Sequence, residues 1–183
     1  MKLLICIDDT DNLDSIGTGQ LLENLCADLA ARGLGTGGYV TRHQLLIHED
    51  IEYTSHNSSM CCAVETENPA AVTAAAKAYL ESNAASGSDP GLCILLLQPG
   101  EAFDQLTEFG LRAQTEVLQK ADAYEAADHF PELLSLTEHG GTGDGVIGAL
   151  AGVGLRLSGS DGRIKGKLRP EDGEEVLTAA HSA

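Results

Sequence analysis

Four carboxylates directly follow an apolar run near the start of the chain. Residues 3–7 are all apolar, a length too short to cross a membrane and typical of a buried strand. Asp8, Asp9, Asp11 and Asp14 come next. Carboxylate oxygens are the ligands that hard cations such as Mg²⁺ prefer, and carboxylates this close repel one another unless a cation or solvent intervenes. We therefore predict a metal site on Asp8, Asp9 and Asp11; the alternative is a solvated acidic turn.

A glycine and a threonine after these acids predict the start of a helix that can bind an anion. Gly17 and Thr18 precede an apolar stripe with helical spacing over residues 20–32. The first turn of a helix has backbone N–H groups without partners inside the helix, and such groups bind phosphate. The segment therefore suits a metal-bound phosphate, while the simpler alternative makes Thr18 an ordinary N-cap.

A glycine-rich stretch at residues 139–145 is the second candidate for phosphate binding. It runs into a segment of small apolar residues at 146–154, which we predict to be a helix. The backbone N–H groups of such a loop can hold a phosphate. The stretch is not a P-loop, because the G-K-[ST] ending is absent. The alternative is a flexible connection whose glycines allow the helix to pack closely.

The order of the periodic apolar segments predicts an α+β fold, a two-layer α/β sandwich with a ferredoxin-like βαββαβ core and additional C-terminal helices. We expect both core helices on one face of the sheet, a third helix at 101–121 and a terminal hairpin within 155–169. The core strands are predicted at 2–8, 39–47, 59–66 and 92–97, and the core helices at 19–32 and 69–84.

The predicted domain organisation is simple. A single domain should cover residues 1–170, with the ferredoxin-like core in about 1–98. A helical extension that contains the Gly-rich loop should occupy about 99–170, and residues 171–183 should form a loosely ordered tail.

This topology also predicts which loops meet. Because a helix returns between the first two core strands, both strands run in the same direction. The loops 8–19, 48–58 and 83–91 should then lie at the same end of the sheet. The acidic cluster and residues Thr54 to Asn57 can therefore face one pocket. His56 lies in this shared loop, and we group it with Asp8 and Asp9 as the candidate catalytic residues; the alternative for His56 is a surface histidine.

Composition limits the classes of function. The chain has 183 residues and a net charge of −17, which argues against unaided binding to nucleic acid or to an anionic membrane surface. No apolar stretch reaches the 18 residues expected of a transmembrane helix, and the N-terminus does not have the pattern of a signal peptide. We interpret the five cysteines as buried, reduced thiols of a cytoplasmic protein.

Three stretches together resemble one enzyme family. They are I-D-D-T-D-N at 7–12 with Gly17 and Thr18, Y-T-S-H-N at 53–57, and G-D-G-V-I-G-A-L-A at 143–151. They are similar to the catalytic, kinase-like plus ferredoxin-like, part of the archaeal agmatinylcytidine synthetases that modify an isoleucine tRNA. The family's motifs read I-D-D-T-D-S, Y-K-T-R-G-N and G-R-G-[LI]-I-G-A-L-A, and the resemblance spans roughly residues 1–157.

The resemblance implies a nucleotide-dependent activity. In that family the acidic motif binds Mg²⁺ and the phosphates of ATP, and a kinase-like step activates a cytosine for attack by agmatine. Carried over, it implies that Asp8, Asp9 and Asp11 bind the metal. The nucleotide contacts that it implies are Gly17, Thr18, Thr54, Asn57, Gly143, Gly145 and Gly148.

The chain departs from the family pattern at two cationic positions. Ser55 and His56 replace the family's Arg and Gly, and Asp144 stands where the family has an Arg between two glycines. The sequence also ends where the family continues into an OB-fold and a zinc ribbon, the parts that hold tRNA. These differences indicate a short, stand-alone relative of the catalytic part.

Three functions remain open from the sequence. The first is Mg²⁺- and ATP-dependent phosphotransfer or ligase-like activity on a small-molecule or protein acceptor rather than on tRNA alone. The second is a non-catalytic nucleotide- or metal-binding module, a sensor or subunit that kept the fold. The third is a structural subunit whose acidic loop is merely solvated. Assembly into a homo-oligomer is compatible with all three.

Overall fold

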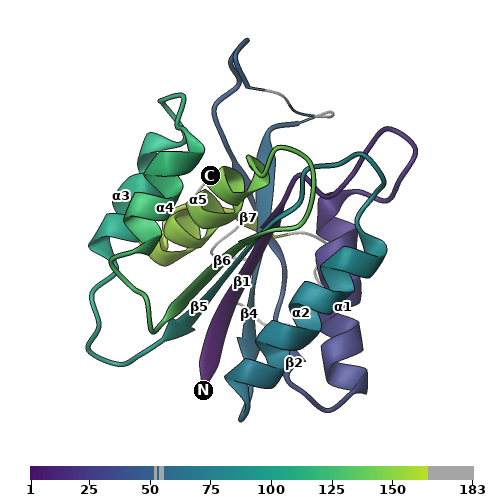
Figure 1. Cartoon of the computed structure of the whole chain (residues 1–183). Helices are drawn as coiled ribbons and strands as arrows, with labels where there is room; N and C mark the ends of the chain where they lie inside the picture. The colour runs from purple at the N-terminus through teal and green to yellow at the C-terminus, as the bar shows by residue number, and fades with distance from the viewer. Residues whose placement is uncertain (52, 54–55, 165–183) are drawn as a thin grey trace.

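A central sheet separates two layers of helices in the computed structural model, which describes residues 1–51, 53 and 56–164 (Figure 1). The strands are β1 (Lys2–Asp8), β2 (Thr36–Gly37), β3 (Thr41–Gln44), β4 (Ser58–Glu65), β5 (Gly91–Leu97), β6 (Leu134–Glu138) and β7 (Arg163–Ile164). The helices are α1 (Thr18–Ala31), α2 (Pro69–Asn83), α3 (Asp104–Arg112), α4 (Lys120–Ala127) and α5 (Gly145–Ser158).

The four core strands form a ferredoxin-like sheet. Their order is β5-β1-β4-β3, and each neighbouring pair is antiparallel. β6 extends the sheet beyond β5 and β7 extends it beyond β3, while the short β2 pairs with β4. Mixed helices and an antiparallel sheet in this order confirm the predicted α+β fold and βαββαβ core.

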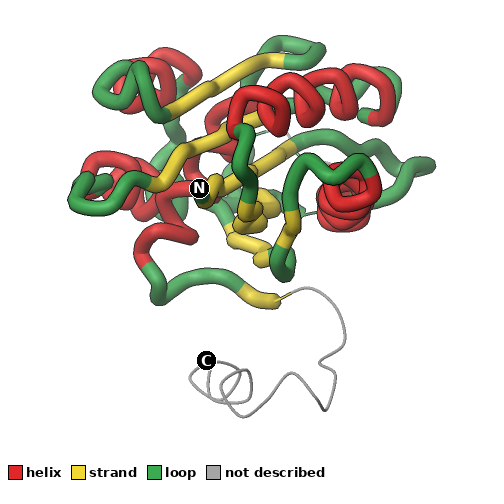
Figure 2. The backbone as a smooth tube through the Cα atoms, turned by 90° about the horizontal axis from the view of Figure 1, so that it is seen from below, coloured by secondary structure: helices red, strands yellow, loops and turns green. Residues whose placement is uncertain are grey.

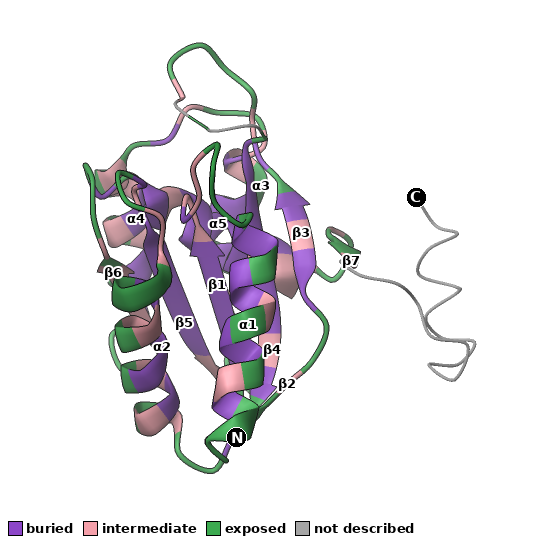
Figure 3. Ribbon diagram, turned by 90° about the vertical axis from the view of Figure 1, so that its right-hand side faces the viewer, coloured by how far each residue is buried: buried purple, intermediate pink, exposed green. Residues whose placement is uncertain are grey.

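The central strand β1 is buried on both faces, which explains why its sequence is a continuous apolar run. Successive side chains of a strand point to opposite faces. Leu3, Ile5 and Ile7 accordingly join the cluster that α1 and α2 build on one face, and Leu4 and Cys6 join the cluster on the other face. Figure 3 shows β1 buried behind α1 and α2. The prediction that both core helices cover one face is therefore confirmed.

The C-terminal elements form a third layer on the opposite face. Helix α5 packs directly on β1, β4 and β5, and α3 packs on α5. The view from below shows helices on both sides of the sheet (Figure 2). The segment after residue 99 was predicted to be helical with a terminal hairpin. It also contributes β6, which was not predicted, whereas β7 lies within the second strand of the predicted hairpin.

Two predicted elements in this segment are wrong. The single helix at 101–121 is instead two helices, because α3 ends at Arg112 and a capping box between Gln119 and Asp122 starts α4. The first strand of the predicted terminal hairpin, residues 155–157, belongs to α5, which ends at the left-handed Gly159. Residues 165–169 of that hairpin and the predicted tail at 171–183 lie outside the described residues.

Two further sequence interpretations concern cysteines and membranes. All five cysteines are buried and free of disulfides, as expected. Among the helices that the structure describes, none combines the length and the apolar character needed to span a bilayer.

Candidate functional site

A cavity of about 1340 Å³ lies at the end of the sheet where β1 ends and β4 begins. The loops that gather there are at the upper end of the sheet in Figure 1. The three loops that the topology brings to one end all contribute to its lining, and the glycine-rich loop before α5 joins them. The lining includes Asp8, Asp9, Asp11, Gly17, Thr18, His56, Asn57, Asp89, Gly145 and Gly148.

Asp8 ends β1 and lies against the first turns of α5. A Cβ atom on Gly148 would overlap the Asp8 carboxylate, so only glycine allows the helix backbone this close. Burial is the main reason why the pKa of Asp8 is raised to about 8, and the nearby charges of Asp9 and Asp11 raise it further. A hydrogen bond from the Asp9 backbone acts in the opposite direction and lowers the pKa. A carboxyl group that is difficult to ionise alone becomes easy to ionise beside a cation, which is the setting of a metal ligand.

Asp9 and Asp11 share the cavity with Asp8 but do not complete a cage around one point. Among the residues that the structure describes, no three His, Cys, Asp or Glu side chains are placed to hold a metal ion together. Asp9 has a left-handed backbone with φ of 49°, which is uncommon for a residue other than glycine. Mg²⁺ commonly uses only one or two carboxylates and completes its shell with water and phosphate oxygens. The residues present therefore fit a metal that arrives with a phosphate.

The N-terminus of α1 offers hydrogen-bond donors to the cavity. Gly17 is the N-cap, no side chain caps the helix, and the first turn contains no acidic residue. Thr18 is therefore not the N-cap of the simpler interpretation; it is the first helical residue, and it is buried. Gly17, Thr18 and Gly19 all line the cavity, and an uncapped helix start is suited to a phosphate.

Asp89 is the principal residue that the sequence did not reveal. Its carboxylate accepts hydrogen bonds from the backbone N–H groups of Thr142 (3.1 Å), Gly143 (2.7 Å) and Asp144 (3.1 Å) and from the Thr142 hydroxyl (2.5 Å). Its own N–H donates to the Asp9 carbonyl (3.1 Å). Asp89 thus joins the acidic turn to the glycine-rich loop.

These bonds change the interpretation of the glycine-rich loop. Its anion-binding N–H groups already hold a carboxylate of the same chain, so a phosphate there has to displace Asp89. Gly143 and Gly145 are also explained by packing, since a Cβ on Gly143 would overlap Glu138 and one on Gly145 would overlap the Asp89 carbonyl. Gly148 remains at the cavity through its contact with Asp8.

The loop between β3 and β4 places two predicted residues at the cavity, and one of them also holds the loop in place. His56 is exposed and lines the cavity. Asn57 is buried, its side-chain amide donates to the Leu46 carbonyl (2.5 Å), and its backbone carbonyl accepts from Leu45 N–H (2.9 Å). Asn57 therefore fixes the loop that carries His56. Thr54 and Ser55 lie outside the described residues.

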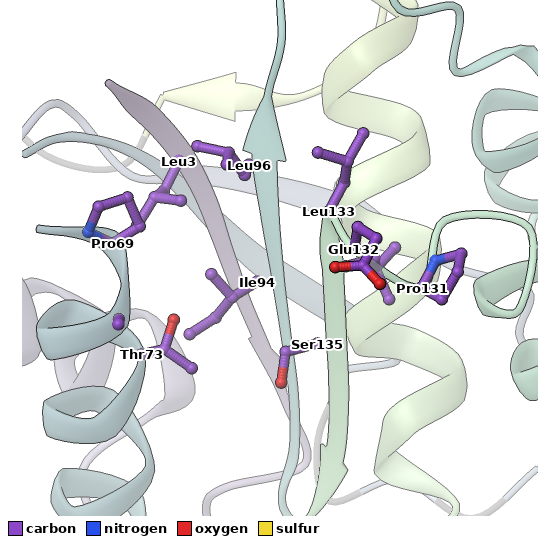
Figure 4. Close-up of a pocket in the computed structure, with 11 residues that line it drawn as sticks. Leu3, Pro69, Thr73, Ile94, Leu96, Pro131, Glu132, Leu133 and Ser135 are labelled. Carbon is purple, nitrogen blue, oxygen red and sulfur yellow. The ribbon is translucent and has the colours of Figure 1, made fainter.

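A second, smaller hollow of about 220 Å³ lies between α2 and β6, at the other end of β1 (Figure 4). Its lining is mostly apolar, with Leu3, Ile94 and Leu96 from the sheet and Pro69 from α2. Among the described residues that line it, Glu132 has the single ionisable side chain. It offers no cluster of groups for catalysis or metal binding, so the large cavity is the candidate site.

Comparisons with known proteins agree with this geometry. No protein-family model matches the sequence, and neither does any curated protein. The fold matches solved structures of TiaS, an agmatidine (agmatinylcytidine) synthetase of an isoleucine tRNA. The complex of TiaS with this tRNA and ATP has a TM-score of 0.71 and 25% sequence identity over 84% of the present chain and 36% of TiaS.

Two further TiaS structures give the same result. The complex with tRNA, AMPCPP and agmatine has a TM-score of 0.70 and 23% identity, covering 84% of the present chain and 36% of TiaS. The apo form has a TM-score of 0.70 and 23% identity, covering 84% and 35%. The chain thus spans about a third of the length of these relatives. The resemblance to this family is confirmed at the level of the fold, and the chain is a structural relative of about a third of the agmatidine synthetase TiaS.

Proposed function

We propose that the large cavity binds ATP together with Mg²⁺, and that the protein transfers a phosphoryl group to a small-molecule or protein acceptor rather than to tRNA alone. The observation that carries the proposal is the meeting of two features in one cavity. These are the half-buried Asp8 carboxyl group and the uncapped N-terminus of α1. The similarity of the fold to TiaS, whose structures include complexes with ATP and with AMPCPP, also supports ATP as the ligand.

The chemistry requires positioned phosphates and cations near the developing negative charge. Bound Mg²⁺ would supply positive charge at the phosphates. Asp8 would hold the metal, with Asp9 or Asp11 as a second carboxylate. The N–H groups of Thr18 and Gly19 would donate to phosphate oxygens.

His56 is proposed as the acid or base that exchanges a proton with the acceptor. It is exposed at the cavity, where an acceptor could reach it. A histidine is suited to proton exchange near neutral pH. The five free cysteines support activity in a reducing, cytoplasmic compartment.

Calorimetric titration with ATP, with and without Mg²⁺, tests the binding. We expect ATP to bind in the presence of Mg²⁺ and Asp8→Asn to abolish the Mg²⁺-dependent part. Asp14→Asn is the matched control, because Asp14 is exposed in the same loop and outside the cavity lining. Absence of ATP binding by the parent protein, or equal binding by Asp8→Asn, contradicts the proposal.

A second candidate is a nucleotide- or metal-binding module without catalysis. Two observations favour it. The Asp89 carboxylate already accepts hydrogen bonds from the backbone N–H groups of the glycine-rich loop, and Asp144 stands at one of the family's arginine positions. Release of ADP from ATP and Mg²⁺ in the presence of candidate acceptors separates the two functions. ATP binding without ADP release under any acceptor identifies the module.

A further inference from the structure

Two arginines face each other across the β3–β7 edge of the sheet. Arg42 and Arg163 are direct partners in the antiparallel register, and both line the large cavity. Arg42 donates from Nε to the Ser58 hydroxyl (3.0 Å) and from a terminal nitrogen to the Gln44 side-chain carbonyl (3.5 Å). Within the described part of the chain, no carboxylate forms an ion pair with either guanidinium. Like charges placed directly opposite on neighbouring strands destabilise a sheet, so this pair requires a reason.

The position of Arg163 is fixed by contacts of the two residues before it. Asp161, two residues earlier, lies with Oδ1 2.7 Å from Nδ1 of His43, and the His43 side chain is fully buried. The second oxygen of Asp161 accepts a hydrogen bond from the Gln114 side chain (3.0 Å). Gly162 packs so closely on the His43 ring that a Cβ atom there would lie 2.7 Å from Cε1. The short strand β7 is thus held firmly beside β3.

The register also separates this pair from Asp8. Arg42 is opposite Met60 on β4, and Met60 is opposite Ile7 on β1. Ile7 faces the α1–α2 layer, whereas Asp8, the next residue, lies against Gly148 of α5 on the other face. The cavity therefore has a carboxylate end at α5 and a cationic end at the β3–β7 edge.

The charge of the cavity makes the pair conspicuous. Among the residues that the structure describes, the other charged ones in its lining are all acidic: Asp8, Asp9, Asp11, Asp50, Asp89, Glu116 and Asp144. Charged residues on an edge strand can serve to prevent edge-to-edge association of sheets. Arg163 is exposed on the edge strand β7 and can serve this role. Arg42 is half-buried on β3, the strand inside that edge, so edge protection does not explain the pair.

We propose that Arg42 and Arg163 form an anion-binding subsite that takes a phosphate group of the acceptor. Two guanidinium groups present planar donor pairs that match phosphate oxygens and bind them bidentately. A bound phosphate converts the repulsion between the arginines into attraction to a shared anion. The assignment to the acceptor rests on the proposed function, but phosphate binding at this pair does not.

Titration with inorganic phosphate, without Mg²⁺ or nucleotide, tests the subsite. Thermal melting and calorimetry would be run at constant ionic strength, with chloride replaced by phosphate. We expect phosphate to raise the melting temperature of the parent protein. Arg42→Gln and Arg163→Gln should each weaken phosphate binding about tenfold, as expected for loss of a charge-assisted hydrogen bond. Arg32→Gln is the matched control, because Arg32 lies at the C-terminal end of α1, away from the cavity. This variant should bind phosphate like the parent.

The sign of the stability change provides a second, independent readout. Without phosphate, Arg163→Gln should be as stable as the parent or more stable, because it removes one of two like charges that are paired on neighbouring strands. With phosphate, the parent should become the more stable protein. Arg163→Lys, which keeps the charge, should retain part of the phosphate effect and shows whether a failure comes from misfolding. An equal phosphate response in the parent, Arg42→Gln and Arg163→Gln overturns the proposal, as does no response beyond that of chloride. If the parent protein does not bind ATP but is still stabilised by phosphate, only the proposed function is refuted.

Discussion

Asp8 combines a half-buried position at the end of β1 with two acidic neighbours. Its pKa of about 8 is raised from 3.8, first by burial and then by Asp9 and Asp11. The unfolded chain would ionise this group near pH 4, while the folded protein retains the proton until about pH 8. The folded state therefore binds more protons over this range, and its stability falls as the pH rises.

Asp8→Asn should remove this pH dependence. The amide has nearly the same shape and carries no charge, so the variant should gain stability relative to the parent as the pH rises from 5 to 8. Urea unfolding at several pH values without metal ions measures the difference, and Asp14→Asn should show no such gain. A constant difference between parent and Asp8→Asn across this range would contradict the assignment.

Asp89→Asn should loosen the glycine-rich loop. The asparagine side chain keeps one oxygen but replaces the other by a donor, which faces loop N–H groups that are also donors. We expect a loss of about 1–3 kcal/mol in the free energy of unfolding and faster hydrogen exchange at residues 142–144. Asp50→Asn, in the loop between β3 and β4, is the control. Unchanged hydrogen exchange at residues 142–144 would show that the hydrogen bonds of Asp89 do not hold the loop.

The sequence revealed Asp8 and Gly148 but not Asp89, for a physical reason. Asp8 follows a buried strand and belongs to a motif, so its chemistry can be read locally. Asp89 lies in an ordinary polar turn, and its partners are more than fifty residues away in the chain. The value of its carboxylate depends entirely on which loop the fold places opposite it.

At the scale of elements, α5 is the helix whose sequence is most constrained by its neighbours. Glycine at 152 allows contact with Cys6 and Ser59 of the sheet, and glycine at 154 allows contact with the Leu106 carbonyl of α3. Added Cβ atoms at these places would overlap their neighbours. The small residues of α5 are therefore explained by its close packing on the sheet and on α3.

Gly154→Ala should destabilise the protein by about 1–3 kcal/mol, the usual cost of overpacking. The α3–α5 contact has to open, because the obstructing atom belongs to the backbone. Gly38→Ala is the matched control, since the added methyl would make an ordinary 3.6 Å contact with the Ala63 carbonyl. Chemical denaturation of both variants gives the comparison, and equal stability would be inconsistent with the packing described here.

Long, strongly periodic elements were predictable, whereas short ones were not. Strands β1, β4 and β5 and helices α1 and α2 have uninterrupted apolar patterns, and they lie close to their predicted bounds. The break between α3 and α4 was missed because Val117 and Leu118 continue the apolar pattern through the connection, although Gln119 and Asp122 carried the sequence signal of a new helix start. β7 has two residues and is fixed mainly by contacts of Asp161 with distant residues.

On the scale of the whole molecule, the net charge of −17 should oppose folding. Screening by salt weakens repulsion between surface charges. Raising NaCl from about 10 to 300 mM, a range that shortens the Debye length from about 30 Å to below 10 Å, should raise the melting temperature by roughly 2–4 °C, which corresponds to about 1 kcal/mol. Calorimetric scans measure this rise.

A specific metal effect should exceed this screening. At equal ionic strength, MgCl₂ should stabilise the parent more than NaCl and should stabilise Asp8→Asn no more than NaCl, because only a bound cation acts through mass action. An equal response of the parent to the two salts would leave the acidic cavity without a Mg²⁺ site.

The global topology followed from the order of elements because antiparallel pairing and same-side helices leave few alternatives. The third layer could not be derived in the same way. Two of its helices, α3 and α4, have only 9 and 8 residues. β6 has four residues of intermediate burial followed by the exposed Glu138, with no clean alternation.

The central place of β1 has a consequence during synthesis on the ribosome. The strand emerges first, but its two partners, β4 and β5, are completed only at Glu65 and Leu97. At about 5–20 residues per second, roughly 5 to 20 seconds pass between the emergence of Asp8 and of Leu97. Throughout that interval five consecutive apolar residues of the nascent chain have no strand on at least one side. Nascent chains arrested before Leu97 should therefore be cleaved rapidly by proteases and bound by chaperones, and those arrested after α5 should resist both.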